Sequence, residues 1–175
     1  MPLERGLIQV YTGNGKGKTT AALGVALRAA GQGLRVYIAQ FMKGGPEYGE
    51  VVALRQLANV TLERFGRGTF VSAAQPDPED RRLAQEAVAA ATAALAQHGY
   101  DVVILDEINI ALHWGLVSLE QVLALLDAKP PRVELILTGR DAHPAVIERA
   151  DLVTEMCLVK HPYDRGVGAR RGIEY

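Results

Sequence analysis

Short apolar runs alternate with stretches of helical spacing along most of this chain. Most of the runs are continuously apolar, which is typical of parallel strands covered on both faces. They lie at 6–12, 34–41, 60–65, 101–106, 133–138 and 152–158. The stretches between them predict helices at 18–30, 48–58, 78–98, 119–128 and 144–150. This alternation predicts an α/β fold with three layers, in which helices cover both faces of a mostly parallel sheet of about six strands.

Two of these helices carry further local signals. Ser118 is followed three residues later by Gln121, the pattern of a capping box at the start of a helix. The Ala-rich stretch 84–96 predicts a helix that packs closely against the sheet, because alanine favours helices and leaves little bulk between layers.

The length and composition predict one globular domain spanning residues 1–175. The chain is 49% hydrophobic and 22% charged, enough apolar material for a core without disulfides. Its 19 basic and 20 acidic residues give a net charge of −1, which argues against a general nucleic-acid binder. The one cysteine, Cys157, excludes an internal disulfide, and its apolar surroundings at 152–159 predict a buried structural thiol.

No apolar run approaches the roughly 20 residues needed to cross a bilayer. Glu4 and Arg5 stand where a signal peptide would need an apolar run. We therefore expect a cytoplasmic protein with no membrane partner.

A glycine-rich loop follows the first predicted strand and leads directly into a helix. Its residues are Gly13, Asn14, Gly15, Lys16, Gly17, Lys18, Thr19 and Thr20. In this order, backbone N–H groups and the helix N-terminus can bind phosphate, while Lys18 reaches a phosphate and the Thr19 hydroxyl ligates Mg²⁺. The spacing departs from the phosphate-loop consensus, which would place its first glycine at Thr12. We interpret it as a variant phosphate loop, with Lys16 as an extra cation, in a phosphate-loop NTPase-like fold.

A pair of carboxylates, Asp106 and Glu107, ends the predicted strand at 101–106. This places them at the carboxyl edge of the sheet, where open parallel sheets bind ligands. One of the pair is expected to hold the metal, although acidic residues also stabilise helix starts. The chain contains no Asn-Lys-x-Asp motif, so adenine is favoured over guanine.

Taken together, these motifs resemble the ATP:corrinoid adenosyltransferase family over nearly the whole chain. The resemblance is carried by GLIQVYTGNGKGKTTAALG, VYIAQFMKG, VVILDE, LILTGRDAHP and ADLVTEMCLVKHPYDRGVGARRGIEY. It implies transfer of the adenosyl group of ATP to cobalt(I) of a corrinoid with release of triphosphate. It also implies ATP bound in reversed orientation, a flavin-dependent reductant as partner and a homodimer.

The resemblance implies roles for individual residues. Asn14, Lys16, Gly17, Lys18 and Thr19 would grip the triphosphate, and Thr19 and Glu107 would serve Mg²⁺. The loop at 66–71 would contact the corrin, with Phe70 as the aromatic residue that displaces the lower cobalt ligand. Ser72 stands where a second aromatic residue would be expected. Phe70 as an ordinary hydrophobic anchor is the alternative.

Other candidates lie near the same edge of the sheet. Lys43 would contact nucleotide or corrin, or else be a solvated lysine, and Arg140 would touch phosphate. For His113 and Trp114 we favour packing or corrin contact over metal ligation. The loop at 66–77 and the tail at 160–175 are long for simple connections, which is typical of functional loops. In the tail, Lys160, His161 and Arg165 would close over the nucleotide.

Two other functions would use the same phosphate loop. One is a phosphoryl-transfer enzyme or ATPase, because phosphate and Mg²⁺ would be held alike. The other is a protein that binds nucleotide or corrinoid without turnover.

Overall fold

The computed structural model describes residues 3–69, 71, 76–97 and 99–175, and its strands and helices alternate along the chain. The strands are β1 (Ile8–Thr12), β2 (Val36–Phe41), β3 (Val60–Phe65), β4 (Val102–Asp106), β5 (Glu134–Thr138) and β6 (Leu152–Glu155). The helices are α1 (Lys18–Gly31), α2 (Gly49–Leu54), α3 (Pro78–Ala96), α4 (Ile108–His113), α5 (Leu119–Ala128) and α6 (Pro144–Arg149), followed by a 3-10 helix, η1 (Pro162–Arg165).

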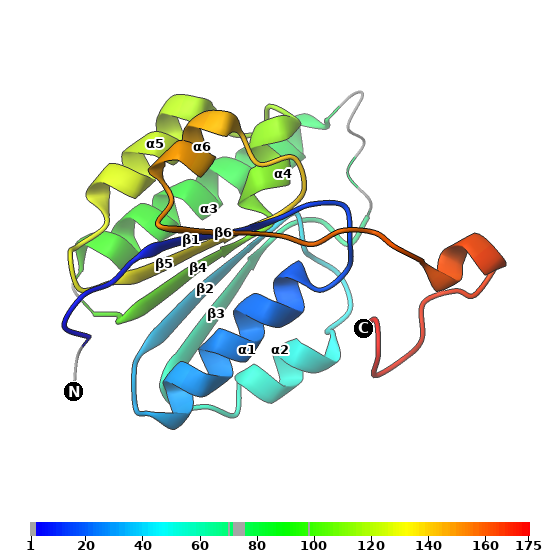
Figure 1. Cartoon of the computed structure of the whole chain (residues 1–175), viewed down its shortest axis with the longest axis horizontal. Coiled ribbons are helices and arrows are strands. Elements are labelled where there is room, and N and C mark those ends of the chain that lie inside the picture. The colour runs from blue at the N-terminus through cyan, green and yellow to red at the C-terminus, as the bar shows by residue number, and fades with distance from the viewer. Residues whose placement is uncertain (1–2, 70, 72–75, 98) are drawn as a thin grey trace.

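The six strands form one sheet in the order β3-β2-β4-β5-β1-β6, and every neighbouring pair is parallel. Figure 1 shows α1 and α2 on one face of this sheet and α3 to α6 on the other. The predicted three-layer α/β architecture is therefore confirmed. Because all strands run in one direction, the loops that follow β1, β2, β4 and β5 meet at one edge.

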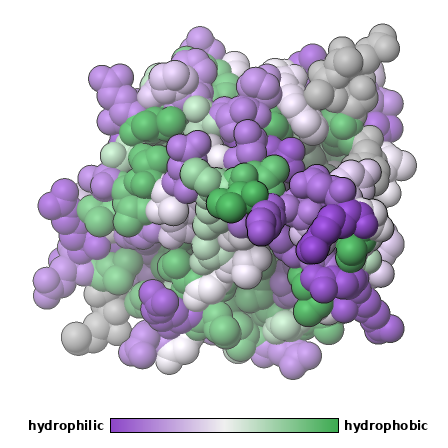
Figure 2. Space-filling model, turned by 45° about the vertical axis from the view of Figure 1, so that its right-hand side comes forward, coloured by the Kyte–Doolittle hydropathy of each residue, from purple (hydrophilic) through white to green (hydrophobic). Residues whose placement is uncertain are grey.

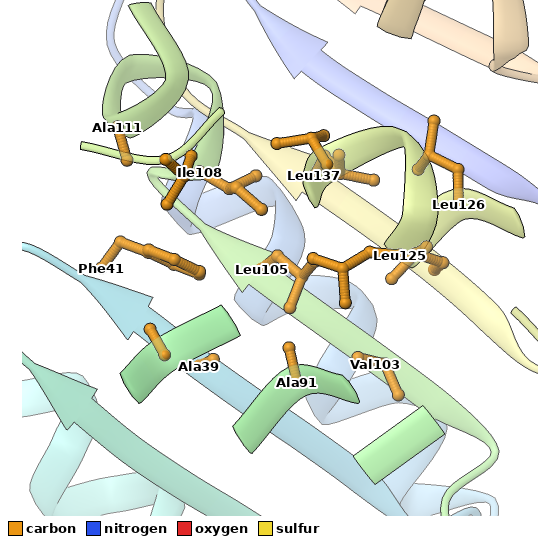
Figure 3. Close-up of a cluster of buried hydrophobic side chains, with 14 of the residues drawn as sticks. Ala39, Phe41, Ala91, Val103, Leu105, Ile108, Ala111, Leu125, Leu126 and Leu137 are labelled. Atoms are coloured by element: carbon orange, nitrogen blue, oxygen red, sulfur yellow. The ribbon is translucent and has the colours of Figure 1, made fainter. Parts of the chain in front are cut away.

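Each face of the sheet contributes to its own apolar core. On the α3 side, Phe41, Leu105 and Leu137 from three adjacent strands gather with Leu125 of α5 (Figure 3). On the other side, small residues of α1 pack against alternate strand residues, which point to the opposite face. The Ala-rich helix α3 buries Ala84, Ala87, Ala91 and Ala94, as its sequence predicts.

Local sequence signals set several helix starts. The Ser118 Oγ accepts a hydrogen bond from the Gln121 backbone N–H at 3.3 Å, and the Gln121 Oε1 accepts one from the Ser118 N–H at 2.9 Å. The predicted capping box is thus present, and α5 has the predicted bounds. Asp77 caps α3 in a similar way, through the N–H of Glu79 at 2.8 Å.

The structure differs from the sequence-based expectations mainly near the ends of elements. The helix expected at 48–58 ends at Leu54, because the next residues form tighter turns, with Gln56 N–H bonded to Ala53 and Leu57 N–H to Leu54. The last strand ends at Glu155 instead of residue 158. Its continuation turns under the glycine loop, where the Met156 carbonyl accepts a hydrogen bond from the Gly15 N–H.

The prediction that Cys157 is a buried thiol is wrong, because its side chain is exposed. Among the described residues, β6 is an edge strand that pairs with β1 alone, and all four of its residues are exposed. An apolar sequence at a sheet edge therefore does not imply burial. Apolar side chains also remain elsewhere at the surface, where Figure 2 shows them interspersed with hydrophilic residues.

Truncation of a core leucine tests the role assigned to these layers. Leu105 is fully buried in β4, so we expect Leu105→Ala to lower the free energy of unfolding by about 2–5 kcal/mol through lost contacts and a cavity. Leu27 of α1 is 61% exposed, and Leu27→Ala should change it by less than about 0.5 kcal/mol. Urea unfolding followed by circular dichroism measures both, and equal losses would contradict the described core.

Candidate active site

The loop after β1 forms a cradle whose backbone lies very close to the chain after β6. Gly13 has a φ of +89°, which favours glycine. A Cβ atom on Gly13 or on Gly15 would lie 2.6 Å from the Met156 carbonyl oxygen. The Gly15 N–H donates a hydrogen bond of 2.6 Å to that same oxygen. Only glycine fits at these two positions, which explains the glycine content of this variant loop.

Lys18 begins α1, and its side chain turns back into the cradle. Its Nζ donates hydrogen bonds to the carbonyl oxygens of Gly13, at 2.7 Å, and Gly15, at 2.6 Å. Burial lowers the pKa of Lys18, and the nearby Glu107 carboxylate opposes that shift. The ammonium group is therefore held at the centre of the loop, where phosphate oxygens can exchange with the backbone oxygens.

Asp106, at the end of β4, is a fully buried carboxylate surrounded by hydrogen-bond donors. Its Oδ1 accepts hydrogen bonds from the hydroxyls of Thr19, at 2.8 Å, and Thr138, at 2.7 Å. Its Oδ2 accepts them from the Lys43 Nζ, at 2.6 Å, and the Gln40 amide, at 3.3 Å. These donors come from α1, β5, β2 and the loop after β2, so Asp106 ties the phosphate loop to the sheet.

Glu107 comes next in the chain and lies at the mouth of the site. Its φ of +68° is unusual for a residue other than glycine, and its N–H donates to the Thr138 hydroxyl at 2.9 Å. Burial, together with the charge of Asp106, raises the pKa of its carboxyl. Met42 after β2 and Asp141 after β5 also have positive φ values, so strained backbone gathers at this edge of the sheet.

Two cavities open at this edge and share part of their walls. The larger, of about 1090 Å³, extends along the glycine loop. The second, of about 440 Å³, has a largely apolar wall that includes Met42, Val71 and Trp114. Residues that line both cavities are Lys43, Tyr48, Glu107 and Arg140.

The C-terminal segment returns to the glycine loop. Figure 1 shows it leaving the sheet after β6 and turning toward the side of α1 and α2. The Lys16 Nζ lies 2.8 Å from the Glu174 carboxylate, which also pairs with Arg170 at 3.0 Å. Hydrogen bonds from Arg170 and then Lys16 hold the pKa of Glu174 below its usual range. His161 and Tyr163 line the larger cavity from the same segment.

Comparison with known proteins shows the family of this chain. The sequence model for ATP:corrinoid adenosyltransferase BtuR/CobO/CobP matches residues 4–175. The chain belongs to this family. The resemblance seen in the motifs, and the transferase class that it implied, are therefore confirmed.

Individual relatives agree with this assignment. The corrinoid adenosyltransferase of Pseudomonas aeruginosa is 41% identical over 173 residues, which cover 98% of this chain and 85% of the relative. The corrinoid adenosyltransferase CobA of Salmonella typhimurium is 42% identical, and the match covers 98% of this chain and 87% of the relative.

A solved structure supports the fold alone. The RadB recombinase structure superimposes with a TM-score of 0.51 at 16% identity, over 91% of this chain and 78% of that chain. The α/β fold is thus shared with a protein of very different sequence.

In the structure, most of the predicted site residues lie around the two cavities. The larger cavity is lined by Asn14, Gly15, Lys16, Gly17, Lys18, Thr19 and Thr20, together with the shared Lys43, Glu107 and Arg140. Thr19 is hydrogen-bonded to Asp106, whereas Glu107, its expected partner in metal binding, presents its side chain to the cavities.

Other predicted residues have different positions. Phe70 and Ser72 lie outside the described residues, so Phe70 stays a prediction. Trp114 packs on the core and lines the second cavity, while His113 is exposed and lies 3.9 Å from Asp141. Of the tail candidates, His161 lines the larger cavity.

Sequence reasoning assigned no role to Gln40, Thr138, Tyr48 or Glu174. Gln40 and Thr138 are polar residues in otherwise apolar strands, a signal that could have identified them as inward-facing. Tyr48 and Glu174 lie far from the loop in sequence and carry no such local signal.

Across residues 3–69, 71, 76–97 and 99–175, no group of three or more His, Cys, Asp or Glu side chains could hold a metal ion. Within the same residues, no helix has both the length and the apolar character needed to cross a membrane.

Proposed function

We propose that this chain transfers the 5′-deoxyadenosyl group of ATP to cobalt(I) of a corrinoid and releases triphosphate. The observation that carries the proposal is the shared wall between the phosphate cradle and the apolar second cavity. A kinase or ATPase needs the cradle, but it needs no large apolar cavity beside it. Here a nucleotide in one cavity and a macrocycle at the other would meet at Lys43, Tyr48, Glu107 and Arg140.

The triphosphate side must stabilise a highly charged leaving group. Lys18 and Lys16, with the loop amides, surround the cradle, and Arg140 lies at its junction with the second cavity. Contacts of this kind that strengthen as charge develops are worth about 3 kcal/mol each. The cobalt(I) centre is itself a strong nucleophile, so no residue is needed as a general base. The protein's task is to align the 5′ carbon and to neutralise the departing phosphates.

The residues present fit a magnesium ion bound together with the nucleotide. Mg²⁺ prefers oxygen ligands and is commonly held by one or two carboxylates plus substrate phosphates. The Thr19 hydroxyl and the Glu107 carboxylate line the same cavity and would supply the protein ligands. The ion would neutralise charge on the triphosphate, and Asp106 would orient Thr19 through their hydrogen bond.

The corrin would contact the second cavity and the loop that follows β3. Near the start of this loop, the Arg67 guanidinium pairs with Asp80 at 2.8 Å and Asp77 at 3.0 Å. Met42, Val71 and Trp114 give the cavity the apolar surface that a macrocycle needs. Phe70 remains our candidate for displacing the lower cobalt ligand.

Truncation of Trp114 tests the corrin side. We expect Trp114→Ala to raise the KM for the corrinoid about tenfold and to leave the KM for ATP unchanged, because it removes apolar contact from the second cavity alone. Trp114→Phe is the matched control and should keep most of the affinity. Steady-state kinetics with each substrate varied in turn measures both constants, and an effect on ATP alone would contradict the assignment.

One anaerobic assay tests the proposed reaction itself. The protein, ATP, Mg²⁺ and chemically reduced cob(I)alamin are mixed, and the visible spectrum and phosphate products are recorded. The proposal expects a cobalt–carbon bond and free triphosphate. ADP with phosphate would instead support a kinase or ATPase, and ligand binding without product would support a carrier. The proposal also includes a flavin-dependent reductant, a homodimer and a cytoplasmic location, which stay predictions.

A further inference from the structure

Lys43 contacts both the Thr19 hydroxyl, which we propose as a magnesium ligand, and the buried Asp106 carboxylate. Its Nζ lies 2.6 Å from the Asp106 Oδ2 and donates a second hydrogen bond, of 3.2 Å, to the Thr19 Oγ1. The Thr19 hydroxyl in turn donates a hydrogen bond to the Asp106 carboxylate. One ammonium group therefore contacts both the hydroxyl proposed to ligate Mg²⁺ and the carboxylate that orients it.

The charges explain why this lysine is bound so closely. The Asp106 side chain has no exposed surface, and a buried carboxylate is costly without a compensating charge. Lys43 supplies that charge, and its own side chain is 20% exposed. Burial disfavours the charged form of Lys43, but the hydrogen bond to Asp106 and the charges of Asp106, Glu107 and Glu50 together outweigh burial and raise the pKa of Lys43. The ammonium group stays protonated in this position.

We propose that Lys43 is a resident counter-ion that makes metal binding conditional on polyphosphate. A divalent cation at Thr19 would meet the ammonium group of Lys43 at close range, and the Thr19 oxygen already accepts a hydrogen bond from that group. The cation alone therefore binds weakly. This inference rests on the proposed role of Thr19 as a metal ligand.

Polyphosphate removes this conflict. Lys43 lines the larger cavity with Lys18 and Thr19, so phosphate oxygens bound in the cradle give its ammonium group an alternative anionic partner. Once Lys43 turns to the phosphates, the Thr19 oxygen is free for the metal, whose charge replaces the ammonium beside Asp106. Metal and polyphosphate then favour each other's binding, and linkage requires the effect to be reciprocal.

Binding of Mn²⁺, a paramagnetic substitute for Mg²⁺, tests this coupling on the full chain. Free Mn²⁺ is measured by electron paramagnetic resonance, with and without inorganic triphosphate, and the Mn²⁺ bound by triphosphate in a matched sample without protein is subtracted. For the wild type we expect weak binding alone and much tighter binding with triphosphate. Lys43→Met should tighten binding of Mn²⁺ alone about tenfold and reduce the effect of triphosphate by a similar factor, within the usual range of coupling between sites.

Three further variants make the result specific. Lys43→Arg keeps the charge and should restore weak binding of Mn²⁺ alone. Lys43→Gln, which removes the charge but keeps an amide donor near Asp106, provides the same test if Lys43→Met does not fold. Lys16→Met is the matched control: it removes one positive charge from the same cavity, but Lys16 pairs with Glu174 rather than Asp106. It should not tighten binding of Mn²⁺ alone.

The outcomes separate this inference from the function on which it rests. If the wild type binds Mn²⁺ with triphosphate, but removal of the Lys43 charge leaves the affinity for Mn²⁺ alone unchanged or weaker, the role of Lys43 is overturned. Equal tightening by Lys16→Met overturns it too, because the effect would then be one of overall charge. A wild type that binds no Mn²⁺ even with triphosphate overturns the proposed metal site itself.

Discussion

Replacing Lys18 by alanine is expected to lower kcat for adenosyl transfer by at least about 100-fold, as removal of one preorganised donor to a developing anion does in other enzymes. The Lys18 ammonium lies inside the glycine cradle, bonded to the Gly13 and Gly15 carbonyl oxygens. Lys16 and Lys43 are held at other points of the cavity wall, beside Glu174 and Asp106, so neither ammonium group lies where the Lys18 ammonium lies. Single-turnover formation of the cobalt–carbon bond from pre-reduced cob(I)alamin measures the loss.

Arg132→Ala is the control for the Lys18 variant. Arg132 is exposed just before β5, at the opposite edge of the sheet, so its loss removes a positive charge without touching the site. Its kcat should equal that of the wild type. Normal turnover by a folded Lys18→Ala protein would show that the glycine cradle takes no part in the reaction.

The second large effect is expected for Glu107→Gln. This change keeps the size of the side chain but removes the carboxylate proposed to hold Mg²⁺ at the junction of the two cavities. Mutation of a group that only supports a metal ligand lowers metal affinity or activity by about 10- to 100-fold. Loss of a direct ligand should therefore lower kcat at fixed Mg²⁺ by about 100-fold or more. A higher Mg²⁺ concentration should restore part of the lost activity. Measuring the rate as a function of Mg²⁺ concentration tests this.

Asp106→Asn provides the comparison within the same carboxylate pair. Asp106 is buried and accepts hydrogen bonds from Thr19, Thr138, Lys43 and Gln40, so its change should lower the thermal unfolding temperature as well as the rate. Glu107→Gln should leave that temperature nearly unchanged. If Glu107→Gln shows the same dependence on Mg²⁺ concentration as the wild type, the metal ligand is Asp106 and not Glu107.

Much of the fold could be predicted from the sequence because its signals are local. All six strands lie within the predicted runs, and the capping box at Ser118 marks the start of α5. Burial of β6 could not be predicted, since Leu152 and Val153 read as core residues. They are 40% and 41% exposed because β6 is the last strand of the sheet, a consequence of strand order. Cys157 follows that strand, and the prediction of its burial failed for the same reason.

The site shows the same division between local and long-range information. The cradle and the carboxylate pair could be recognised from contiguous motifs. The hydrogen bonds that organise them could not, because Thr138 lies 32 residues from Asp106 in sequence and Gln40 lies 66. Contact of Lys43 with nucleotide or corrin stays a prediction, but its ion pair with Asp106 was not expected from the sequence. The pairing of β4 with β2, which sets Gln40 opposite Asp106, and with β5, the strand of Thr138, brings these groups together.

A crystal structure of the chain with ATP and Mg²⁺, without corrinoid, tests the central claim most directly. The account predicts the whole triphosphate on the glycine loop, with Lys18 and Thr19 in contact with it. It also predicts the 5′ carbon facing the junction at Lys43, Tyr48, Glu107 and Arg140, open to the second cavity. A triphosphate bound away from the loop, or a 5′ carbon enclosed by protein with no path to that cavity, would contradict it.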